Sequence, residues 1–501
     1  MKRAHRARQS ARHSAPRAAA WLLAATVLAA AAQPALAHRP AATPDGNGSG
    51  NGNGNTLAEI LAGPEVKRTP NSGRGMPSIM GPFTDTYNME WLGQIPNRDL
   101  GASRLIRTGA TFLSDIWGWT SPAGEEYAIV GHNSGVAFVR VTDPRNPVFL
   151  GTIPTVDTET QRNWWWDVKT FNNHAYFVSE VPYTGVGIFD LTKLDAMSAA
   201  PEDGLLEADA RYHGNGFVAA HNISINEATG FAYLTGVTKD TDIDPSFVDE
   251  GMVILDLNGD PLAPAEAGQV LGRDTHDTHV ISYHGPDADH AGREIAFVFN
   301  GEDHTLGIYD VTVKQVIDVR ADTSITISET GYAGASFTHQ GWVTEDQRFV
   351  IMGDEEDELF GLQDPRNPDL PDTARAYVWN IQDLDSPTVV STFDSPAASI
   401  DHNLFARRDP ASGREFVYHA NYTAGIRVTE LVREGAPGPD QIARLNEVAH
   451  MDTEPRLPNH HLNFNYNIWA GPWGVFPFLD SGTILASDGL NGLVLMRLAL
   501  P

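Results

Sequence analysis

Apolar and polar positions alternate along most of this chain in short runs that are typical of β-strands. One type of run, an apolar strand closed by a polar or acidic residue, recurs with another β-rich run before it. The copies are GVAFVRV (135–141), GVGIFDL (185–191), GMVILDL (251–257), LGIYDV (306–311), RAYVWNI (375–381), GIRVTEL (425–431) and GLVLMRL (492–498). No helical pattern of comparable length competes with them. Short strands that repeat at intervals of about 50 residues predict an all-β fold, a seven-bladed β-propeller with four strands per blade.

The way the ring closes can also be predicted. The first copy is followed by an outer-strand pattern, NPVFLGTIP (146–154), and a near twin, NMEWLGQIP (88–96), occurs before any complete blade. The last blade, residues 473–500, has room for only three strands. We therefore expect residues 89–94 to form its fourth strand, since pairing the two chain ends removes open sheet edges.

Four innermost strands open on a histidine followed by an amide or a carboxylate. The histidines are His221, His276, His339 and His402, at intervals of 55, 63 and 63 residues. Equivalent positions in a ring of repeats face one axis, so we expect these histidines to converge on one face of the channel. Asp115 and Asp167 occupy the openings of the first two blades and are expected to complete the ring.

Neutral imidazoles beside carboxylates are ligands for divalent transition metals. The loops between second and third strands should surround the ring, and several are acidic. They contain Glu180, Glu302, Asp303, Asp354, Glu355 and Glu356. A metal held by the four histidines could activate water, with Glu355 as the candidate base. Two other interpretations stay open: imidazoles that only hydrogen-bond neighbouring strands, and a site for a metal-free ligand.

Several of these segments resemble one known family, the choice-of-anchor B proteins built from LVIVD repeats. GVAFVRVTDPRNPVFLG is similar to the repeat unit, and AHNISINEATGFAYLTG, GASFTHQGWVTEDQRFVIMGDE and WGVFPFLDSGTILASDGLNGLVL resemble its blade-specific signatures. The similarity covers about residues 84–500. It implies a propeller fold and export, and it implies no particular activity.

The N-terminal residues predict the cellular location of the protein. Six basic residues precede an apolar run (18–32) and an A-x-A site at residues 35–37, which together predict a signal peptide cleaved after Ala37. Residues 38–83 contain GNGSGNGNGN (46–55) and are expected to form a flexible linker before a propeller over residues 84–501. With no cysteine in the chain, neither a disulfide nor a lipid-modified cysteine is available. We expect a secreted or periplasmic protein without an anchor.

The net charge of the chain excludes some classes of binding partner. The formal net charge of −29 becomes −35 once the six basic residues of the signal peptide are removed. Such an acidic protein repels nucleic acid and anionic lipid. No segment resembles a membrane span, and we expect a monomer whose partner is an extracellular or periplasmic protein, a glycan or a small molecule.

Two functions from different classes remain open. The first is a binding module whose histidine-lined site is structural or holds an ion. The second is a metal-dependent hydrolase, lyase or oxidase that uses the histidine ring. The sequence has no GxSxG elbow, HExxH motif or phosphate-binding glycine loop. Whether the protein is an enzyme is therefore undecided at this point.

Overall fold

The computed structural model describes residues 79–100, 112–156, 165–214, 217–239, 251–358, 371, 373–455 and 469–501. All of them belong to one compact unit, residues 44–501. The predicted signal peptide and residues 38–78 of the predicted linker lie outside the described residues.

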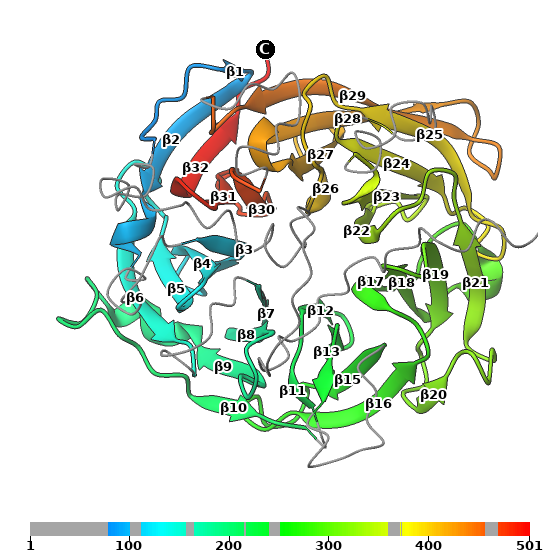
Figure 1. The fold of residues 1–501 in the computed structure, drawn as a ribbon, viewed down its shortest axis with the longest axis horizontal. Coiled ribbons are helices and arrows are strands. Elements are labelled where there is room, and N and C mark those ends of the chain that lie inside the picture. The colour runs from blue at the N-terminus through cyan, green and yellow to red at the C-terminus, as the bar shows by residue number, and fades with distance from the viewer. Residues whose placement is uncertain are drawn as a thin grey trace, which may run out of the picture. The chain divides into compact units, whose positions relative to one another are not determined.

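Seven sheets of four or five strands follow one another in chain order around a central channel, as the described residues show (Figure 1). Blades 1 and 2 contain β3 (Leu113–Thr120), β4 (Glu126–His132), β5 (Gly135–Arg140), β6 (Val148–Pro154), β7 (Trp166–Phe171), β8 (His174–Ser179), β9 (Val186–Asp190) and β10 (Ala210–Tyr212). Blades 3 and 4 contain β12 (Asn222–Asn226), β13 (Phe231–Thr235), β15 (Met252–Asp256), β16 (Ala265–Leu271), β20 (Val316–Asp318), β17 (Thr275–Ser282), β18 (Glu294–Asn300), β19 (Thr305–Asp310) and β21 (Thr326–Gly331).

The ring continues through three more blades. Blades 5 and 6 contain β22 (Thr338–Val343), β23 (Phe349–Asp354), β24 (Arg375–Asn380), β25 (Thr388–Asp394), β26 (Leu404–Arg408), β27 (Glu415–Ala420), β28 (Ile426–Glu434), β29 (Ile442–Met451) and β1 (Thr86–Tyr87). Blade 7 contains β30 (Pro472–Phe476), β31 (Ile484–Asp488), β32 (Gly492–Leu498) and β2 (Met89–Ile95). A separate pair is formed by β11 (Phe217–Ala219) and β14 (Thr238–Lys239).

The seven recurring runs of the sequence form the third strands of the seven blades, so the predicted fold class is confirmed. These strands are β5, β9, β15, β19, β24, β28 and β32. Blades 3 and 6 depart from the four-strand prediction, because β20 adds in parallel to β16 and β1 adds to β29. Both additions lie on the outer edge and leave the inner strands unchanged.

The predicted closure is also confirmed. β2 pairs antiparallel with β32, and the register runs from Met89 opposite Leu498 to Ile95 opposite Leu493. Figure 1 shows this as the blue strand β2 lying beside the red strand β32. The first long strand of the described chain and the last one therefore share a sheet, which covers two edges that would otherwise be open.

The core lies between neighbouring blades. In one cluster, Ile116 and Val130 of blade 1 pack with Leu485 and Leu495 of blade 7, and all four side chains are fully buried. Because a central blade has apolar neighbours on both faces, its middle strands are nearly continuous hydrophobic runs. This packing holds the innermost strands, and hence the channel wall, in fixed positions.

Among the described residues, helical structure consists of short 3-10 turns and the α-helical residues Asp357 and Glu358. The 3-10 turns are η1 (Asn97–Asp99), η2 (Leu191–Ala196), η3 (Ala288–His290) and η4 (Tyr422–Ala424). In the part of the chain that the structure describes, no helix has the length and hydrophobicity needed to cross a membrane.

Candidate metal centre

Two of the four histidines, His276 and His339, coincide with β-bulges at the start of the innermost strands. The register of β17 pairs Thr275 and Asp277 with consecutive residues of β18 and passes over His276. β22 passes over His339, and β30 over Trp473, in the same way. A bulge adds a residue that has no partner in the ladder and interrupts the strict alternation of side chains. A histidine and the residue after it can thus both face the interior.

The four predicted histidines lie in an arc. The ring centroids of His221 and His276 are 4.4 Å apart, those of His276 and His339 are 4.4 Å apart, and those of His339 and His402 are 4.5 Å apart. Trp473 extends the arc, with its ring centroid 4.8 Å from that of His402. Four consecutive blades therefore bring their imidazoles into contact, although these residues are separated by 181 positions in the sequence.

Hydrogen bonds between blades orient these rings. His276 Nδ1 donates to the backbone oxygen of His339 at 3.1 Å, and His402 Nδ1 donates to the backbone oxygen of Trp473 at 2.6 Å. A carbonyl oxygen only accepts, so Nδ1 carries the proton in both rings. In the neutral form the lone pair is then on Nε2, as in metal-binding histidines whose second nitrogen is held by a neighbouring acceptor.

His221 has a different partner. Its Nδ1 lies 2.6 Å from Glu180 Oε1, which confirms that an acidic loop reaches the arc. Burial lowers the pKa of His221, but the hydrogen bond to Glu180 and the charge of that carboxylate outweigh it, so the pKa lies above its usual value. This histidine is the member of the arc with a carboxylate as its direct hydrogen-bond partner.

Glu355 lies between two of the histidines. Its two oxygens are 3.5 Å from His339 Nε2 and 3.5 Å from His402 Nε2. Tyr422 donates its hydroxyl proton to Glu355 Oε1 at 2.7 Å. The residues are almost fully buried, with exposed fractions of 2% for His339, 4% for His402 and 8% for Glu355. Burial raises the pKa of Glu355 to about 8.

This group has the ligand types of a metal site. One ligand atom from each of His339, Glu355 and His402 lies within 4.8 Å of the other two. Two imidazoles and one carboxylate bind catalytic zinc in some proteases and iron in non-haem oxygenases. His276 contacts His339 and could contribute a further nitrogen, whereas His221 lies at the far end of the arc.

Asp115 and Asp167, which were expected to complete the ring, lie instead next to a lysine. Lys169 Nζ is 2.6 Å from Asp167 Oδ1 and 3.9 Å from Asp115 Oδ2. The second oxygen of Asp167 accepts from the backbone N–H of Ile223 in the next blade, at 2.8 Å. Within the described residues, neither aspartate belongs to the group of ligand atoms around Glu355.

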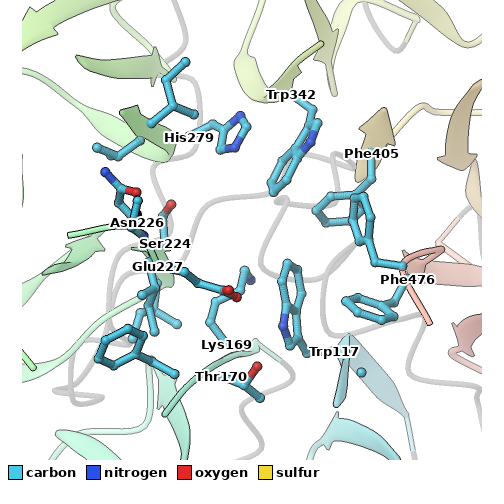
Figure 2. Close-up of a pocket in the computed structure, with 18 of the residues that line it drawn as sticks. Trp117, Lys169, Thr170, Ser224, Asn226, Glu227, His279, Trp342, Phe405 and Phe476 are labelled. Carbon is cyan, nitrogen blue, oxygen red and sulfur yellow. Dashed lines mark hydrogen bonds between the residues drawn. The ribbon is translucent and has the colours of Figure 1, made fainter. Parts of the chain in front are cut away.

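The channel beside the arc contains a cavity of about 790 Å³ that the sequence reasoning did not predict. Figure 2 shows an aromatic side formed by Trp117, Trp342, Phe405 and Phe476. It shows Ser224, Asn226 and Glu227 on the opposite side and Lys169 next to Trp117. The imidazole of His279 stacks on Trp342, with ring centroids 3.6 Å apart and planes at 13°. The cavity thus has one apolar and one polar wall.

A regular spacing in the sequence could have revealed this cavity. Trp117, His279, Trp342, Phe405 and Phe476 each stand three positions after the first residue of their strand opening. Once the bulge is taken into account, that position faces the channel again, since side chains alternate along a strand. The bulge itself carries no sequence signal that distinguishes it from regular strand.

Comparisons with known proteins add little to this picture. No family model and no curated protein matches the chain. Among solved structures, a chain of "Kuenenia stuttgartiensis Hydrazine Synthase" is similar, with a TM-score of 0.44 and 11% sequence identity over 78% of this chain and 95% of that chain. A likeness this distant carries no conclusion about activity.

Proposed function

We propose that this chain is an exported LVIVD-repeat propeller of the choice-of-anchor B type that acts as a binding module and holds a divalent transition metal ion. His339, Glu355 and His402 are the ligands, and His276 is the candidate for a fourth. The family resemblance over residues 84–500 supports the first part of this proposal. The geometry around Glu355 supports the second.

The observation that carries the metal proposal is the pair of distances at Glu355. At 3.5 Å, both His–Glu separations exceed the 2.7–3.2 Å of an ordinary N–H···O hydrogen bond. Two ligands that are each about 2.1 Å from a tetrahedral ion lie about 3.4 Å from each other. The side chains are therefore spaced as ligands of one ion rather than as hydrogen-bond partners. The orientation of His402 by Trp473 favours the same interpretation.

The burial of the site favours a binding module over the alternative, a metal-dependent hydrolase, lyase or oxidase. A catalytic zinc keeps an open position for water or substrate, whereas a structural zinc is enclosed by its ligands. The candidate ligands here are between 2% and 8% exposed. The two-walled cavity is of a size typical of small-molecule sites, roughly 300–1,000 Å³, and a small molecule is the partner that it fits.

Elemental analysis of residues 38–501, purified without chelator, tests the metal proposal. We expect about one divalent transition metal ion per chain, and a loss of affinity of roughly 10–100-fold or more in His339→Ala and His402→Ala. His279→Gln is the matched control, because it replaces a buried histidine of the same channel outside the ligand group, and it should retain the metal.

Two outcomes would contradict this proposal. The first is wild-type protein that contains no metal and whose melting temperature no transition metal raises, which would leave the imidazoles as hydrogen-bonding groups only. The second is equal loss of metal in His279→Gln, because the loss would then follow from general disruption of the channel.

Export is tested separately from the site. Expression with the native first 37 residues should give a product in the periplasm or the medium. N-terminal sequencing of that product should begin at His38, one residue after the A-x-A site. An uncleaved protein retained in the membrane fraction would be incompatible with this part of the proposal.

A further inference from the structure

A second group of carboxylates lies on the same two segments as the histidine site. Asp357 and Glu358 follow β23 shortly after Glu355, and Asp401 directly precedes His402. One carboxylate oxygen from each of Asp357, Glu358 and Asp401 lies within 4.8 Å of the other two. The exposed fractions of these residues are 0%, 0% and 3%. Three acidic side chains are thus packed together away from solvent.

The oxygens of Asp357 and Glu358 divide into two kinds. One oxygen of each has an ordinary protein donor: Tyr377 donates to Asp357 Oδ2, and the backbone N–H of Arg375 donates to Glu358 Oε1, both at 2.9 Å. The other oxygen of each, Asp357 Oδ1 and Glu358 Oε2, is buried and accepts no hydrogen bond from outside the acidic group, within which the two carboxyl groups are hydrogen-bond neighbours. The satisfied oxygens therefore account for the fold of this segment, and the unsatisfied ones remain to be explained.

Asp401 provides an independent observation that points to a ligand. Both of its carboxylate oxygens are buried and accept no hydrogen bond from outside this acidic group, and within the group the carboxyl of Glu358 is the hydrogen-bond neighbour. Its position is accommodated by Gly353, where even a single added carbon would overlap Asp401 Oδ2. Buried polar groups in folded proteins nearly always have partners. A buried carboxylate whose neighbours are two other carboxyl groups needs a positive partner, which is either a proton shared within the group or a bound cation.

Among the described residues, the nearest basic side chain forms its ion pair with another carboxylate. Arg375 is close enough to act on Asp357, but its guanidinium Nε lies 2.6 Å from Asp394 Oδ1 in a separate ion pair. A buried carboxylate without a counter-charge is costly, and it is stabilised either by a bound proton or by a cation. The two alternatives at this site are therefore protonated carboxyl groups and a bound cation.

We propose that Asp357, Glu358 and Asp401 bind a calcium ion. Calcium prefers oxygen ligands at about 2.3–2.6 Å, so ligands on opposite sides of one ion lie about 4.8 Å apart. The separations in this group fall within that limit, and the set contains carboxylate oxygens without nitrogen or sulfur. The ion joins the loop after β23 in blade 5 to the segment before β26 in blade 6. This site does not depend on the transition metal at Glu355, since it uses different residues.

Calcium titration of chelator-treated residues 38–501 tests the proposal at pH 7.5, by calorimetry and by thermal melting. We expect calcium to bind and to raise the melting temperature. Asp401→Asn and Glu358→Gln should each weaken binding at least tenfold. Asp385→Asn is the matched control: it removes a carboxylate from a more exposed acidic group, with Asp287 and His290, and should leave the calcium affinity unchanged.

The sign of the change in melting temperature separates calcium from protons. Without calcium, Asp401→Asn should melt higher than the wild type, because one of three repelling carboxylates has been removed. With saturating calcium it should melt lower, because a ligand has been lost. If calcium, magnesium and manganese leave the wild-type melting temperature unchanged, the carboxyl groups are stabilised by protons and the proposal is wrong.

The variant His339→Ala tests whether the calcium site is independent of the histidine site. Retention of calcium by His339→Ala would show that the two sites are separate, and loss of calcium in that variant would overturn their independence.

Discussion

Blades 1 and 2 bury two carboxylates beside a lysine, whereas blades 5 and 6 bury three carboxylates without a basic side chain among them. In the first cluster Lys169 lies against Asp167 and Asp115, and its ammonium also sits 4.6 Å above the ring of Trp117. In the second cluster Asp401 accepts no hydrogen bond from outside the acidic group. The first cluster has its counter-charge in Lys169, and among the described residues no basic side chain takes that place in the second cluster.

This difference shows that buried acidic residues do not by themselves mark a binding site. Burial lowers the pKa of Lys169, but the charges of Asp167 and Asp115 outweigh that effect and raise it. The lysine thus stays charged and balances Asp167, while burial and the charge of Asp167 raise the pKa of Asp115 well above its usual value, so that a proton on Asp115 completes the cluster. The variants below test this difference between the two carboxylate clusters.

The largest effect is expected for Lys169→Met. This change leaves Asp115 and Asp167 buried without their cation, and breaking a buried pair in this way costs about 3–5 kcal/mol of unfolding free energy. Urea unfolding at pH 7.5 measures the loss. Lys193→Met is the control, because Lys193 pairs with Asp209 at the surface, where such pairs contribute less than about 1 kcal/mol. If the two variants are equally stable, Lys169 contributes no more to stability than a surface lysine, and this prediction is wrong.

A smaller effect on the unfolding free energy is expected from His279, a buried titratable residue with no carboxylate bound to it. His279 stacks on Trp342, and its Nδ1 accepts the backbone N–H of Val343 at 3.0 Å. Burial lowers the pKa of His279 to about 3. The unfolded chain then binds a proton at a higher pH than the folded one, so stability is complete above about pH 6.5 and is lost as the pH falls.

For His279 alone, this linkage amounts to about 2 kcal/mol between pH 8 and pH 5. The variant His279→Gln cannot titrate, so the difference in unfolding free energy between wild type and variant should shrink by that amount over this range. Using the difference removes the contributions of the buried carboxylates, which titrate in both proteins. If the difference in unfolding free energy stays constant from pH 8 to pH 5, His279 has the same pKa in the folded and the unfolded chain and becomes charged in the folded protein.

The sequence predicted the repeating parts of this molecule well and the individual pairings poorly. The runs at residues 135–141 and 492–498 predicted third strands, because alternation over several residues follows directly from strand geometry. The contact of consecutive histidines, such as His339 and His402, followed from their equivalent positions in neighbouring repeats. Glu355 was correctly placed in a loop beside them.

The two aspartates of the first blades illustrate what could not be predicted. Asp115 and Asp167 were assigned to the histidine ring because they belong to the equivalent strand openings, although they stand one position after the histidines and align with Asn222 and Asp277. Their pairing with Lys169 depends on the direction and reach of a long side chain in three dimensions, which the repeat pattern does not contain. The run DEEDE at residues 354–358 is likewise typical of a solvated loop, and its burial against Asp401 follows only from tertiary packing.

The pairing of β2 with β32 has a consequence for the order of events during synthesis. β2 leaves the ribosome first and β32 last. About 400 residues separate them, which at roughly 5–20 residues per second corresponds to about 20–80 s. During that time Leu92 and Ile95 have no sheet partner, while the middle blades can already form. Ring closure therefore comes after the synthesis of all seven blades, and it cannot precede the emergence of β32.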